Sequence, residues 1–512
     1  MSTNEEPSAT GFTRASGRFD DSSSPLPDTA YPNSFVRHGA GSYWLERVAG
    51  HKHLVVSSSD EHVLDDFDGQ TAETPSGTPR KSCPTNSGNA AALRRALPWL
   101  TPRPLGLATS AGMGDRLGIA TPGHVLALAR VGAGISPIFA QQSIREMTRT
   151  HRSPEQVMTD ATWGAFEAGW RAAVGADADH LKTFEDIDRC VAAGFTFFTI
   201  DPGEHVDDGA HDLNETALRE NVGALPWDDL DTSLADLETR FRGRVLDLDG
   251  GRITFDTEAV LRAASKYGRA VAHVHRMYRH LEAKGVPSEL EISVDETAYP
   301  TSHLEHAYVA LELLRLGVRW VSLAPRFVGG FEKGIDYLGD SRTLRADLVG
   351  HAAVARALGP YKLSLHSGSD KFSVYAPIMA ATRGLVHLKT AGTSYLEALR
   401  VVASVQPDLF REVAALATER FETDRATYHI SSSLHDVPAI DTLSDQQLPQ
   451  LLDADPSRQV LHVTFGSALD AFRGELMAVL REHEERHYQG LAAHFERHLR
   501  PFATGNAQGT LV

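Results

Sequence analysis

Histidine and carboxylate side chains recur at the ends of short apolar runs, in types and numbers that suit a catalytic divalent cation. The expected metal ligands are His180, Glu296, His303 and His366, with Asp295, His306 and Gln142 in reserve. Neutral imidazoles and a carboxylate are ligands that Zn²⁺, Mn²⁺, Ni²⁺ or Co²⁺ takes at a site with an open position. Each histidine could instead be a hydrogen-bonded packing residue, so the prediction depends on several of them meeting at one place.

Basic, amide and hydroxyl side chains accompany these residues and suit the recognition of a small oxygen-rich anion. The expected substrate-binding residues are Arg116, Gln142, Lys182, Arg326, Ser367, Lys371 and Lys389. Arginine presents a planar fork that matches a carboxylate or phosphate, and Lys333 adds a further positive charge. We expect Arg326 and Lys371 to hold a substrate carboxylate. For any one of these cations, a salt bridge with a neighbouring aspartate is an equal alternative.

Three carboxylates are candidates for proton transfer. They are Asp115, Glu296 and Asp370, each placed close after an apolar run. A general acid or base must lie within hydrogen-bond reach of the reacting group. We predict that Asp115 and Asp370 serve as the acid and base, and that Glu296 serves either in proton transfer or as a metal ligand.

Eight short apolar runs carry these residues, and helix-patterned stretches separate most of them. The runs span residues 105–110, 136–142, 178–183, 195–201, 289–297, 319–325, 361–367 and 384–390. Several are nearly apolar throughout, as strands covered on both faces are. This alternation predicts an α/β fold, a (β/α)₈ TIM-like barrel. The alternative is a doubly wound open sheet, but its functional residues would gather at one switch point rather than after nearly every strand.

The chain is expected to divide into four parts. In chain order they are a disordered tail (1–30), a small N-terminal β unit with a linker (31–100), the barrel (101–405) and a mainly helical C-terminal region (406–512). The tail is rich in Ser, Thr, Pro, Asp and Glu, a composition that cannot bury enough apolar surface to fold. Residues 71–88 have a similar composition and are interpreted as the linker.

An insertion is expected after the fourth strand, because residues 202–288 are too many for one βα loop. It contains a hairpin signal at 244–255, with Asp-Gly-Gly as the turn, and a helix-patterned stretch at 257–285. The C-terminal region also contains two β-like runs, 428–433 and 460–467. Either of these could replace one of the eight barrel strands.

Composition narrows the classes of function. The 512 residues include 50 Lys plus Arg and 67 Asp plus Glu, a formal net charge of −17, which argues against a nucleic-acid partner. Two cysteines cannot form a disulfide framework or a cysteine-type zinc site. A metal site must therefore use carboxylates and some of the 24 histidines. The polar N-terminus and the lack of an 18-residue apolar run predict a cytoplasmic protein without a membrane span.

Nine strings in a fixed order resemble the tagaturonate epimerase family. They are GDRLGIATPGH, PIFAQQSIREMTRT, GADADHLKT, GFTFFTIDPG, SVDETAYPTSHLEH, SLAPRFVGGFEKGIDYLGD, YKLSLHSGSDKFSVY, HLKTAGTSYLEALR and LHVTFGS. No single string is diagnostic, whereas the ordered set is specific. The resemblance implies a metal-dependent epimerase that inverts C4 of a 2-keto hexuronate, converting D-tagaturonate to D-fructuronate. The residue roles given above come from the residue types and positions alone.

Inversion at C4 restricts the chemistry, because C4 lies one carbon beyond the acidified C3 of a 2-ketose. Retro-aldol cleavage of the C3–C4 bond, rotation of the aldehyde and re-addition would achieve it, with a divalent cation stabilising the enediolate. Reversible oxidation at C4 would need a hydride carrier, and the sequence has no GxGxxG fingerprint for one. We therefore expect the metal route, with metal-assisted proton or hydride transfer at C4 itself as an alternative.

Three other functions remain compatible with the residues. One is a metal-dependent 4-epimerase of neutral ketohexoses such as tagatose and fructose. Another is an aldolase or lyase that has the same barrel fold and acts on a related sugar acid. The third is a carbohydrate-binding protein without turnover, although binding alone needs hydrogen bonders and aromatic side chains rather than a cluster of His, Asp, Glu and Lys. In each case the partner is a small sugar acid or ketose.

Overall fold

The eight predicted strands form a closed parallel barrel. The computed structural model describes residues 26–73, 78–366, 370–390, 392–428 and 430–504. Around the barrel the strands follow the order β12, β13, β14, β15, β6, β7, β8, β9. Their bounds are β6 Ser110–Gly112, β7 Ser136–Ser143, β8 Gly175–Leu181, β9 Phe197–Ile200, β12 Glu289–Val294, β13 Ser322–Pro325, β14 Lys362–Leu365 and β15 Val386–Lys389. The pairing of β15 with β6 closes the ring, which confirms the barrel and excludes the open sheet.

The first barrel strand begins later than the sequence pattern indicates. The apolar run covers residues 105–110, whereas β6 covers Ser110–Gly112. The preceding residues make a turn, in which the Ala108 amide donates to the Leu105 carbonyl at 3.4 Å. The apolar run therefore predicts that this strand exists, but it does not predict the residue at which the strand begins.

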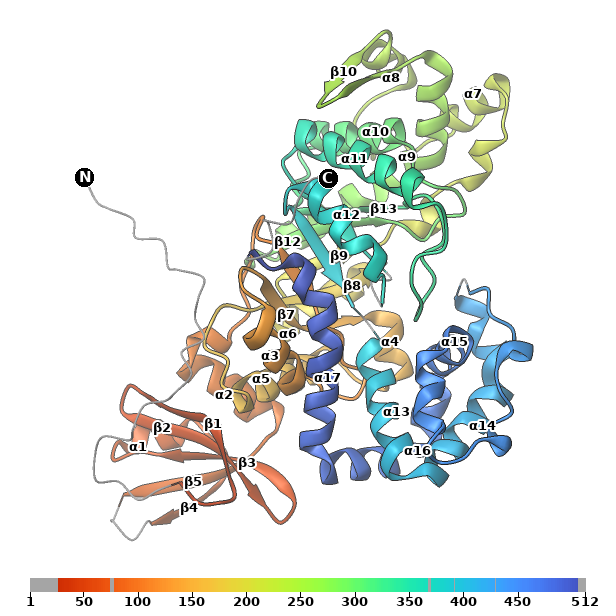
Figure 1. Cartoon of the computed structure of the whole chain (residues 1–512). Coiled ribbons are helices and arrows are strands. Elements are labelled where there is room, and N and C mark those ends of the chain that lie inside the picture. The colour runs from red at the N-terminus through yellow and green to blue at the C-terminus, as the bar shows by residue number, and fades with distance from the viewer. Residues whose placement is uncertain (1–25, 74–77, 367–369, 391, 429, 505–512) are drawn as a thin grey trace.

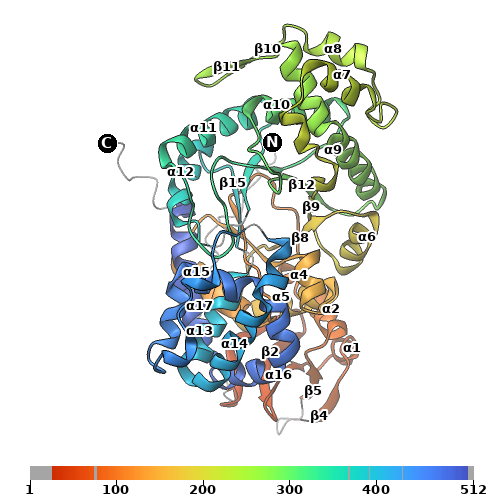
Figure 2. The ribbon, with the colours of Figure 1, turned by 90° about the vertical axis from the view of Figure 1, so that its right-hand side faces the viewer.

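Helices surround the barrel, and each strand is followed by at least one of them (Figures 1 and 2). Their bounds are α3 Thr121–Val131, α4 Ile144–Arg149, α5 Pro154–Glu167, α6 Phe184–Ala193, α9 Thr257–Ala283, α10 His303–Arg315, α11 Ser341–Leu358, α12 Phe372–Thr382 and α13 Thr393–Val405. Side-chain caps define several starts; Ser302, for example, forms a capping box with Glu305 before α10. Among the described residues, no helix combines the length and apolarity needed to cross a membrane.

The insertion after β9 forms its own small unit beside the barrel. It consists of α7 (Glu215–Gly223), α8 (Leu234–Phe241), the hairpin β10–β11 (Val245–Leu248 and Gly251–Thr254), and the long helix α9. The hairpin pairs Leu248 with Gly251 across the predicted turn. Figures 1 and 2 show α7, α8 and the hairpin at one end of the molecule, with α9 connecting them to the barrel.

The N-terminal region is a five-stranded antiparallel sheet in the order β1, β2, β3, β5, β4. The strands are β1 Ala30–His38, β2 Gly41–Val48, β3 His51–Ser57, β4 Gln70–Glu73 and β5 Pro79–Pro84. The interpretation of residues 71–88 as a linker is therefore wrong for β4 and β5. The polar residues misled because most side chains of β5 are only partly buried, whereas Cys83 pairs with Leu54 and is fully buried. Pro79 and Pro84 are tolerated because they stand at the ends of β5.

The C-terminal region is helical, as expected, but its two β-like runs are not strands. Its main helices are α14 Pro407–Asp424, α15 Asp455–Val463, α16 Phe465–Glu482 and α17 Glu484–Leu499. The run 460–467 divides between α15 and α16, and the described part of 428–433 is irregular. Val460, Leu461 and Val463 are apolar because they pack in a second hydrophobic core that α14, α15 and α16 form with α13. Tertiary packing therefore overrides β-propensity here.

The packing of α17 on α3 leads to a test of the fold. A Cβ on Gly123 of α3 would lie 2.6 Å from Leu491 Cβ and 3.0 Å from the Tyr488 carbonyl oxygen. We expect Gly123→Val to lower the free energy of unfolding by about 1–3 kcal/mol, because the two helices cannot separate freely. Gly490→Ala on α17 is the control, since its Cβ meets nothing within 4 Å and alanine favours a helix. Thermal unfolding followed by circular dichroism measures both, and equal Tm values would contradict the prediction.

Candidate functional site

The interior of this barrel is polar, and β12 shows why. Its residues alternate, so that the apolar Leu290, Ile292 and Val294 point outward while Glu291 and Ser293 point inward. Both inward side chains are buried. Sequence reasoning missed Glu291, although the alternation in ELEISVD was the signal that could have found it.

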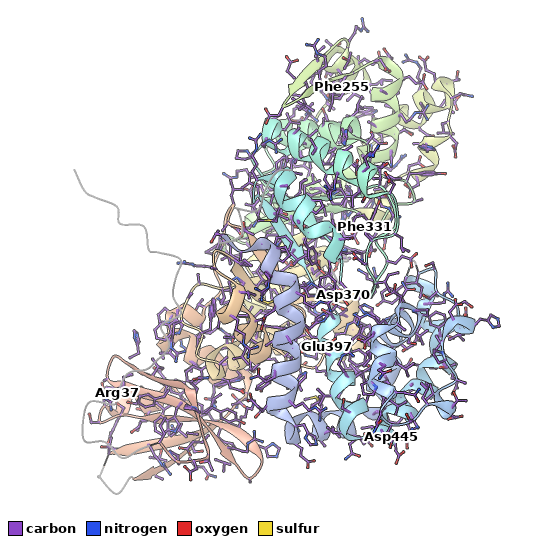
Figure 3. All side chains as sticks on the ribbon, in the orientation of Figure 1. Arg37, Phe255, Phe331, Asp370, Glu397 and Asp445 are labelled. Carbon is purple, nitrogen blue, oxygen red and sulfur yellow. The ribbon has the colours of Figure 1, made fainter. Side chains whose placement is uncertain are left out.

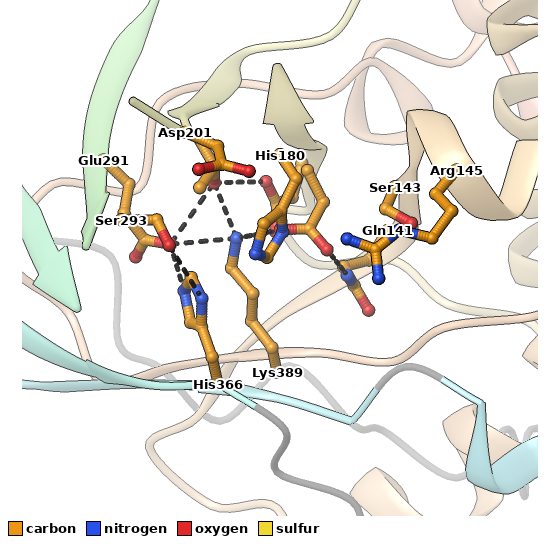
Figure 4. Close-up of polar contacts among 12 residues, drawn as sticks. Gln141, Ser143, Arg145, His180, Asp201, Glu291, Ser293, His366 and Lys389 are labelled. Carbon is orange, nitrogen blue, oxygen red and sulfur yellow. Dashed lines mark hydrogen bonds and ion pairs between the residues drawn. The ribbon is translucent and has the colours of Figure 1, made fainter. Parts of the chain in front are cut away.

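Lys389 on β15 is the centre of a buried ion cluster (Figure 4). Its Nζ lies 3.0 Å from Asp177 Oδ2, 2.6 Å from Asp179 Oδ1 and 2.9 Å from Glu291 Oε1. It also donates to Thr199 Oγ1 at 2.6 Å. Lys389 therefore points into the barrel, but its ammonium is bound by the protein's own carboxylates.

The cluster's charges shift one another's pKa. Burial opposes ionisation of Lys389, Asp179 and Glu291. The carboxylates nevertheless raise the pKa of Lys389 above its usual range. His180 and Lys389 hold the pKa of Asp179 well below its usual range, and Lys389 and His366 do the same for Glu291. All of these groups are consequently charged at neutral pH.

Two histidines from opposite sides of the barrel approach one carboxylate above this cluster. His366 Nδ1 lies 3.2 Å from Asp295 Oδ1, and His180 Nε2 lies 3.9 Å from the same oxygen. The other ring nitrogens are held by carboxylates: His180 Nδ1 is 2.8 Å from Asp179 Oδ1, and His366 Nε2 is 2.7 Å from Glu291 Oε1. His180, Asp295 and His366 offer ligand atoms within 4.8 Å of one another.

The backbone of His180 helps to aim its ring. Its φ is +53°, in the left-handed region that a residue with a Cβ rarely adopts. The ladder between β8 and β9 shifts register between Ala178 and Leu181, so the strand is irregular here. Such local strain is typical of functional sites, where the surrounding structure maintains it.

The carboxylates around the two imidazoles attract positive charge. Burial would lower both histidine pKa values, but neighbouring negative charge outweighs it. Asp179 is the main cause for His180, whose pKa rises to about 10. Asp295 is the main cause for His366, whose pKa rises to about 9. The site is therefore one that favours cations.

Two cavities meet at the carboxyl ends of the strands, above the histidine pair. Their volumes are about 290 Å³ and about 410 Å³. His180 and Lys182 line the smaller one, and Asp295, His366 and Arg326 line the larger. The side chains lining both are Arg145, Glu296, Lys333 and Tyr428. Together the cavities have room for a six-carbon sugar beside the histidines.

The charges lining the cavities differ in how they are paired. Glu296 Oε2 pairs with Arg145 Nη2 at 3.0 Å, and Lys182 Nζ pairs with Glu204 Oε1 at 2.9 Å. Within the described part of the chain, Arg326 and Lys333 have no carboxylate partner. These two cations are therefore available to a bound anion.

A larger cavity of about 600 Å³ lies elsewhere, between the N-terminal sheet, α5, α16 and α17. Its charged groups bind one another: Lys52 Nζ is 2.5 Å from both Glu167 Oε2 and Glu484 Oε1. It contains none of the residues of the histidine pair, and we assign the chemistry to the barrel mouth.

Six predicted site residues reach the strand ends, and a seventh lies at their edge. The six are His180, Lys182, Glu296, Arg326, His366 and Lys389. Arg116 lines the smaller cavity, but its guanidinium is buried and bonded to Glu146 Oε1 at 2.8 Å and to the His462 carbonyl at 3.0 Å. Arg116 therefore forms part of the wall of the smaller cavity, and its guanidinium is not available to bind a substrate as predicted.

Both predicted acid–base aspartates are placed elsewhere, which is a correction. Asp115 accepts hydrogen bonds from the backbone amides of Leu117, Gly118 and Ala120, so it shapes the loop before α3. Asp370 is bound by Arg458, and its Oδ1 lies 3.0 Å from both His494 and His498 (Figure 3 labels Asp370). Neither carboxylate lines the two cavities.

Other predicted residues serve the scaffold. Lys371 is fully buried and donates to the Glu332 and Ile335 carbonyls, and burial lowers its pKa to about 7. Gln142 donates to Glu146, whereas its neighbour Gln141 donates to Asp179 at 3.2 Å. Because successive side chains of a strand point to opposite faces, Gln141 and not Gln142 points toward the site. Ser367 lies outside the described residues.

The histidines of the His-Leu-Glu-His string do not join the barrel site either. His303 is the first residue of α10, and its Nε2 lies 3.3 Å from Asp347 Oδ1. His306 Nδ1 lies 2.9 Å from His351 Nδ1, between α10 and α11. The three-residue spacing places both histidines on one face of α10, but that face packs against α11 and not at the barrel mouth.

The buried Lys389 cluster yields a test of its energetics. We expect Lys389→Met to lower the free energy of unfolding by about 3–5 kcal/mol, because it leaves three buried carboxylates without their ammonium. Adding Glu291→Gln should recover part of this loss by removing one negative charge. Urea unfolding measures both variants.

The control is Lys284→Met, which removes an exposed ion pair with Asp188 (2.6 Å) and should leave stability essentially unchanged, because exposed ion pairs contribute little. If Lys389→Met were as stable as this control, the cluster would not have the importance assigned to it.

Comparison with known proteins agrees with the architecture. The family model for tagaturonate epimerase matches residues 31–502. The chain is 42% identical over 472 residues to the tagaturonate/fructuronate epimerase of Thermotoga maritima, covering 92% of this chain and 96% of that protein. The crystal structure of the fructuronate-tagaturonate epimerase of Cohnella laeviribosi is 36% identical and superposes with a TM-score of 0.86, covering 92% of this chain and 96% of that one; a complex of that protein with one glycerol gives 0.87. The predicted resemblance is confirmed: the chain belongs to the tagaturonate epimerase family and is a carbohydrate epimerase.

Proposed function

We propose that this chain inverts C4 of D-tagaturonate to give D-fructuronate, with a divalent cation held by His180, Asp295 and His366. Relatives at 42% and 36% identity are named for these two sugar acids. The observation that carries the metal assignment is the convergence of two imidazole nitrogens on one carboxylate oxygen, at 3.2 Å and 3.9 Å. Zn²⁺, Mn²⁺, Ni²⁺ and Co²⁺ all accept such a set of nitrogen and oxygen donors.

The surroundings of the three residues support a cation between them. His180 Nε2 is buried and has no hydrogen-bond partner among the described residues. The opposite nitrogens of His180 and His366 are held by Asp179 and Glu291, the arrangement by which proteins orient metal-binding imidazoles. Glu296 was also predicted as a ligand; it reaches His180 in another group, with Asp201, and we assign it to proton transfer instead.

Recognition of a sugar acid is assigned to the two cations without a carboxylate partner. Lys333 lines both cavities and Arg326 lines the larger. A carboxylate placed between them would gain charge-assisted hydrogen bonds from both. A neutral ketohexose would leave both cations unpaired, so this pair favours a uronate over tagatose or fructose.

Proton transfer and carbon–carbon cleavage follow from the placement of Glu296 and Lys182. When held by His180, Asp295 and His366, a divalent cation would supply positive charge that stabilises the enediolate. Glu296 takes the proton of the C4 hydroxyl, the C3–C4 bond breaks, its electron pair enters the C2–C3 enediolate, and C4 becomes an aldehyde. Rotation about C4–C5 presents the other face, the C3–C4 bond re-forms, and Lys182 donates a proton to the C4 oxygen. Atoms and charge balance once Glu296 and Lys182 exchange a proton through water.

The direct test is to incubate the full-length protein with D-tagaturonate and with D-fructose in deuterium oxide, before and after chelation, and to identify products by NMR. We expect D-fructuronate from D-tagaturonate, loss of activity after chelation and recovery with Mn²⁺, Ni²⁺, Co²⁺ or Zn²⁺. Because the C4–H bond is never broken in the retro-aldol route, the product should carry no deuterium at C4. Full activity in rigorously metal-free protein would disprove the metal assignment, and accumulation of three-carbon fragments would indicate a lyase.

A matched pair of variants locates the cation in the same experiment. His366→Gln should lose at least 10²-fold in activity and lose bound metal. The control is His280→Gln, which removes a partly buried histidine of the outer helix α9 that pairs with Asp188 of α6 (2.7 Å). Equal metal content and activity in the two variants would place the cation elsewhere.

Substrate choice is tested by Lys333→Gln. We expect KM for D-tagaturonate to rise by about tenfold or more, because one charge-assisted bond to the carboxylate, worth about 1.5–3 kcal/mol, is lost. Turnover of a neutral ketohexose, if any, should be unaffected. Steady-state kinetics on both substrates measures this split, with Lys284→Gln on the outer surface as the control. A parallel change for both substrates would contradict the role of Lys333 in recognising a carboxylate.

A further inference from the structure

A second group of metal-type ligands lies outside the barrel, where α10 and α11 face each other. His303 begins α10, while Asp347 and His351 are four residues apart on one face of α11. His303 Nε2 is 3.3 Å from Asp347 Oδ1, and His351 Nε2 is 3.5 Å from the same oxygen. The three residues offer ligand atoms within 4.8 Å of one another.

The spacing of these atoms fits a small tetrahedral cation. Bonds of about 2.0–2.1 Å to a tetrahedral Zn²⁺ place neighbouring ligand atoms about 3.3 Å apart. The two separations from Asp347 Oδ1 are 3.3 Å and 3.5 Å. Hydrogen-bonded nitrogen and oxygen atoms would instead most often lie about 2.9–3.0 Å apart.

His351 is presented as a metal ligand would be. Its side chain is fully buried, yet Nε2 has no hydrogen-bond partner among the described residues. Its Nδ1 lies 2.9 Å from His306 Nδ1, and His306 Nε2 lies 2.8 Å from the Tyr361 hydroxyl. The ring is therefore oriented from behind while its other nitrogen faces Asp347, the arrangement of an imidazole prepared for a cation.

The backbone of α11 makes room for the third ligand. A Cβ on Gly350 would overlap the His303 imidazole. Glycine in the middle of a helix is unfavourable by roughly 0.5–1 kcal/mol relative to alanine, and here the missing side chain is what allows His303 to reach Asp347. His303 Nε2 is also 3.1 Å from the Asp347 carbonyl oxygen, a contact that a cation would replace.

We propose that His303, Asp347 and His351 form a second divalent-cation site, of the zinc type, with a structural role. Its donors all belong to α10 and α11, so it is independent of the cation assigned to the barrel mouth and does not rest on the proposed function. His303 is half-buried, so the site can be reached from solvent.

Such a cation would position the mouth of the barrel. Asp347 Oδ2 accepts a hydrogen bond from the Val328 amide at 3.0 Å. Val328 follows Arg326 and Phe327, which line the larger cavity. One ion would thus connect α10, α11 and the loop that carries Arg326. These three ligands are positioning residues, since none of them lines either cavity.

The test is to count metal in the full-length protein after equilibrium dialysis against buffered free Zn²⁺, using elemental analysis. We expect His303→Gln to hold one zinc per chain fewer than the wild type. Gly350→Ala should show the same deficit, because it displaces His303 without removing a donor and alanine preserves the helix. His280→Gln, which changes a histidine with a single carboxylate partner on the outer helix α9, should retain the wild-type content. In the Co²⁺-loaded protein, His303→Gln should lose part of the visible absorption.

The outcome separates the two metal assignments. His366→Gln and His303→Gln should each remove one zinc, and the double variant should remove two. If His303→Gln, Gly350→Ala and the wild type bind equal amounts, the outer site is wrong and His303, Asp347 and His351 form a hydrogen-bonded cluster, with the Thr301 backbone completing the contacts of His351. A deficit confined to His366→Gln would leave the proposed function standing without the outer site.

Discussion

The ammonium of Lys389, buried among three carboxylates, is the interaction on which the barrel interior depends. Most barrels of this type fill the same space with branched aliphatic side chains. Here Asp177, Asp179 and Glu291 take that place, and moving each charge out of water costs several kcal/mol unless a partner compensates. One ammonium against three carboxylates leaves an excess of negative charge. Asp179 and Glu291 also contact His180 and His366. The excess negative charge therefore favours positively charged groups at the carboxyl ends of the strands.

The arrangement separates the charges that maintain the structure from those left for a ligand. Lys389 and Arg116 are occupied by the protein's own carboxylates. Arg326 and Lys333 are not, and both face open volume. A molecule with formal charge −17 can therefore present a locally positive wall to a small anion, because nearby charges dominate over distant ones that water screens.

Much of this architecture was predictable from the sequence, because both signals involved are local. Apolar runs marked all eight barrel strands, and the polar residues that follow parallel strands gather at one end of a barrel by geometry. His180, Glu296 and His366 could be placed for that reason. Runs 71–88 and 428–433 were misread because composition does not reveal what covers a segment. Val460 and its neighbours are apolar for helix packing, and β-propensity alone cannot distinguish the two cases.

Residue roles were harder to predict than positions, since one residue type serves several purposes. Asp115 and Asp370 follow strands as a catalytic carboxylate would, but one binds backbone amides and the other binds Arg458. The sequence contains no sign of those partners, because they come from distant elements or from the backbone. Glu291 was detectable, by contrast, since a charged residue alternating with Leu290 and Ile292 in a buried strand must face the interior. Strand alternation therefore deserves more weight than proximity to a strand end.

The packing of α17 against α3 has a consequence for how the protein is made. The helix α17 ends at Leu499, among the last residues that the structure describes, whereas α3 follows the first barrel strand. His494 and His498 on α17 also provide the contacts of the buried Asp370. During synthesis, the first βα unit leaves the ribosome more than 350 residues before its covering helix. The newly made barrel must therefore keep an apolar face exposed until α17 has been synthesised, and it depends on protection from aggregation until then.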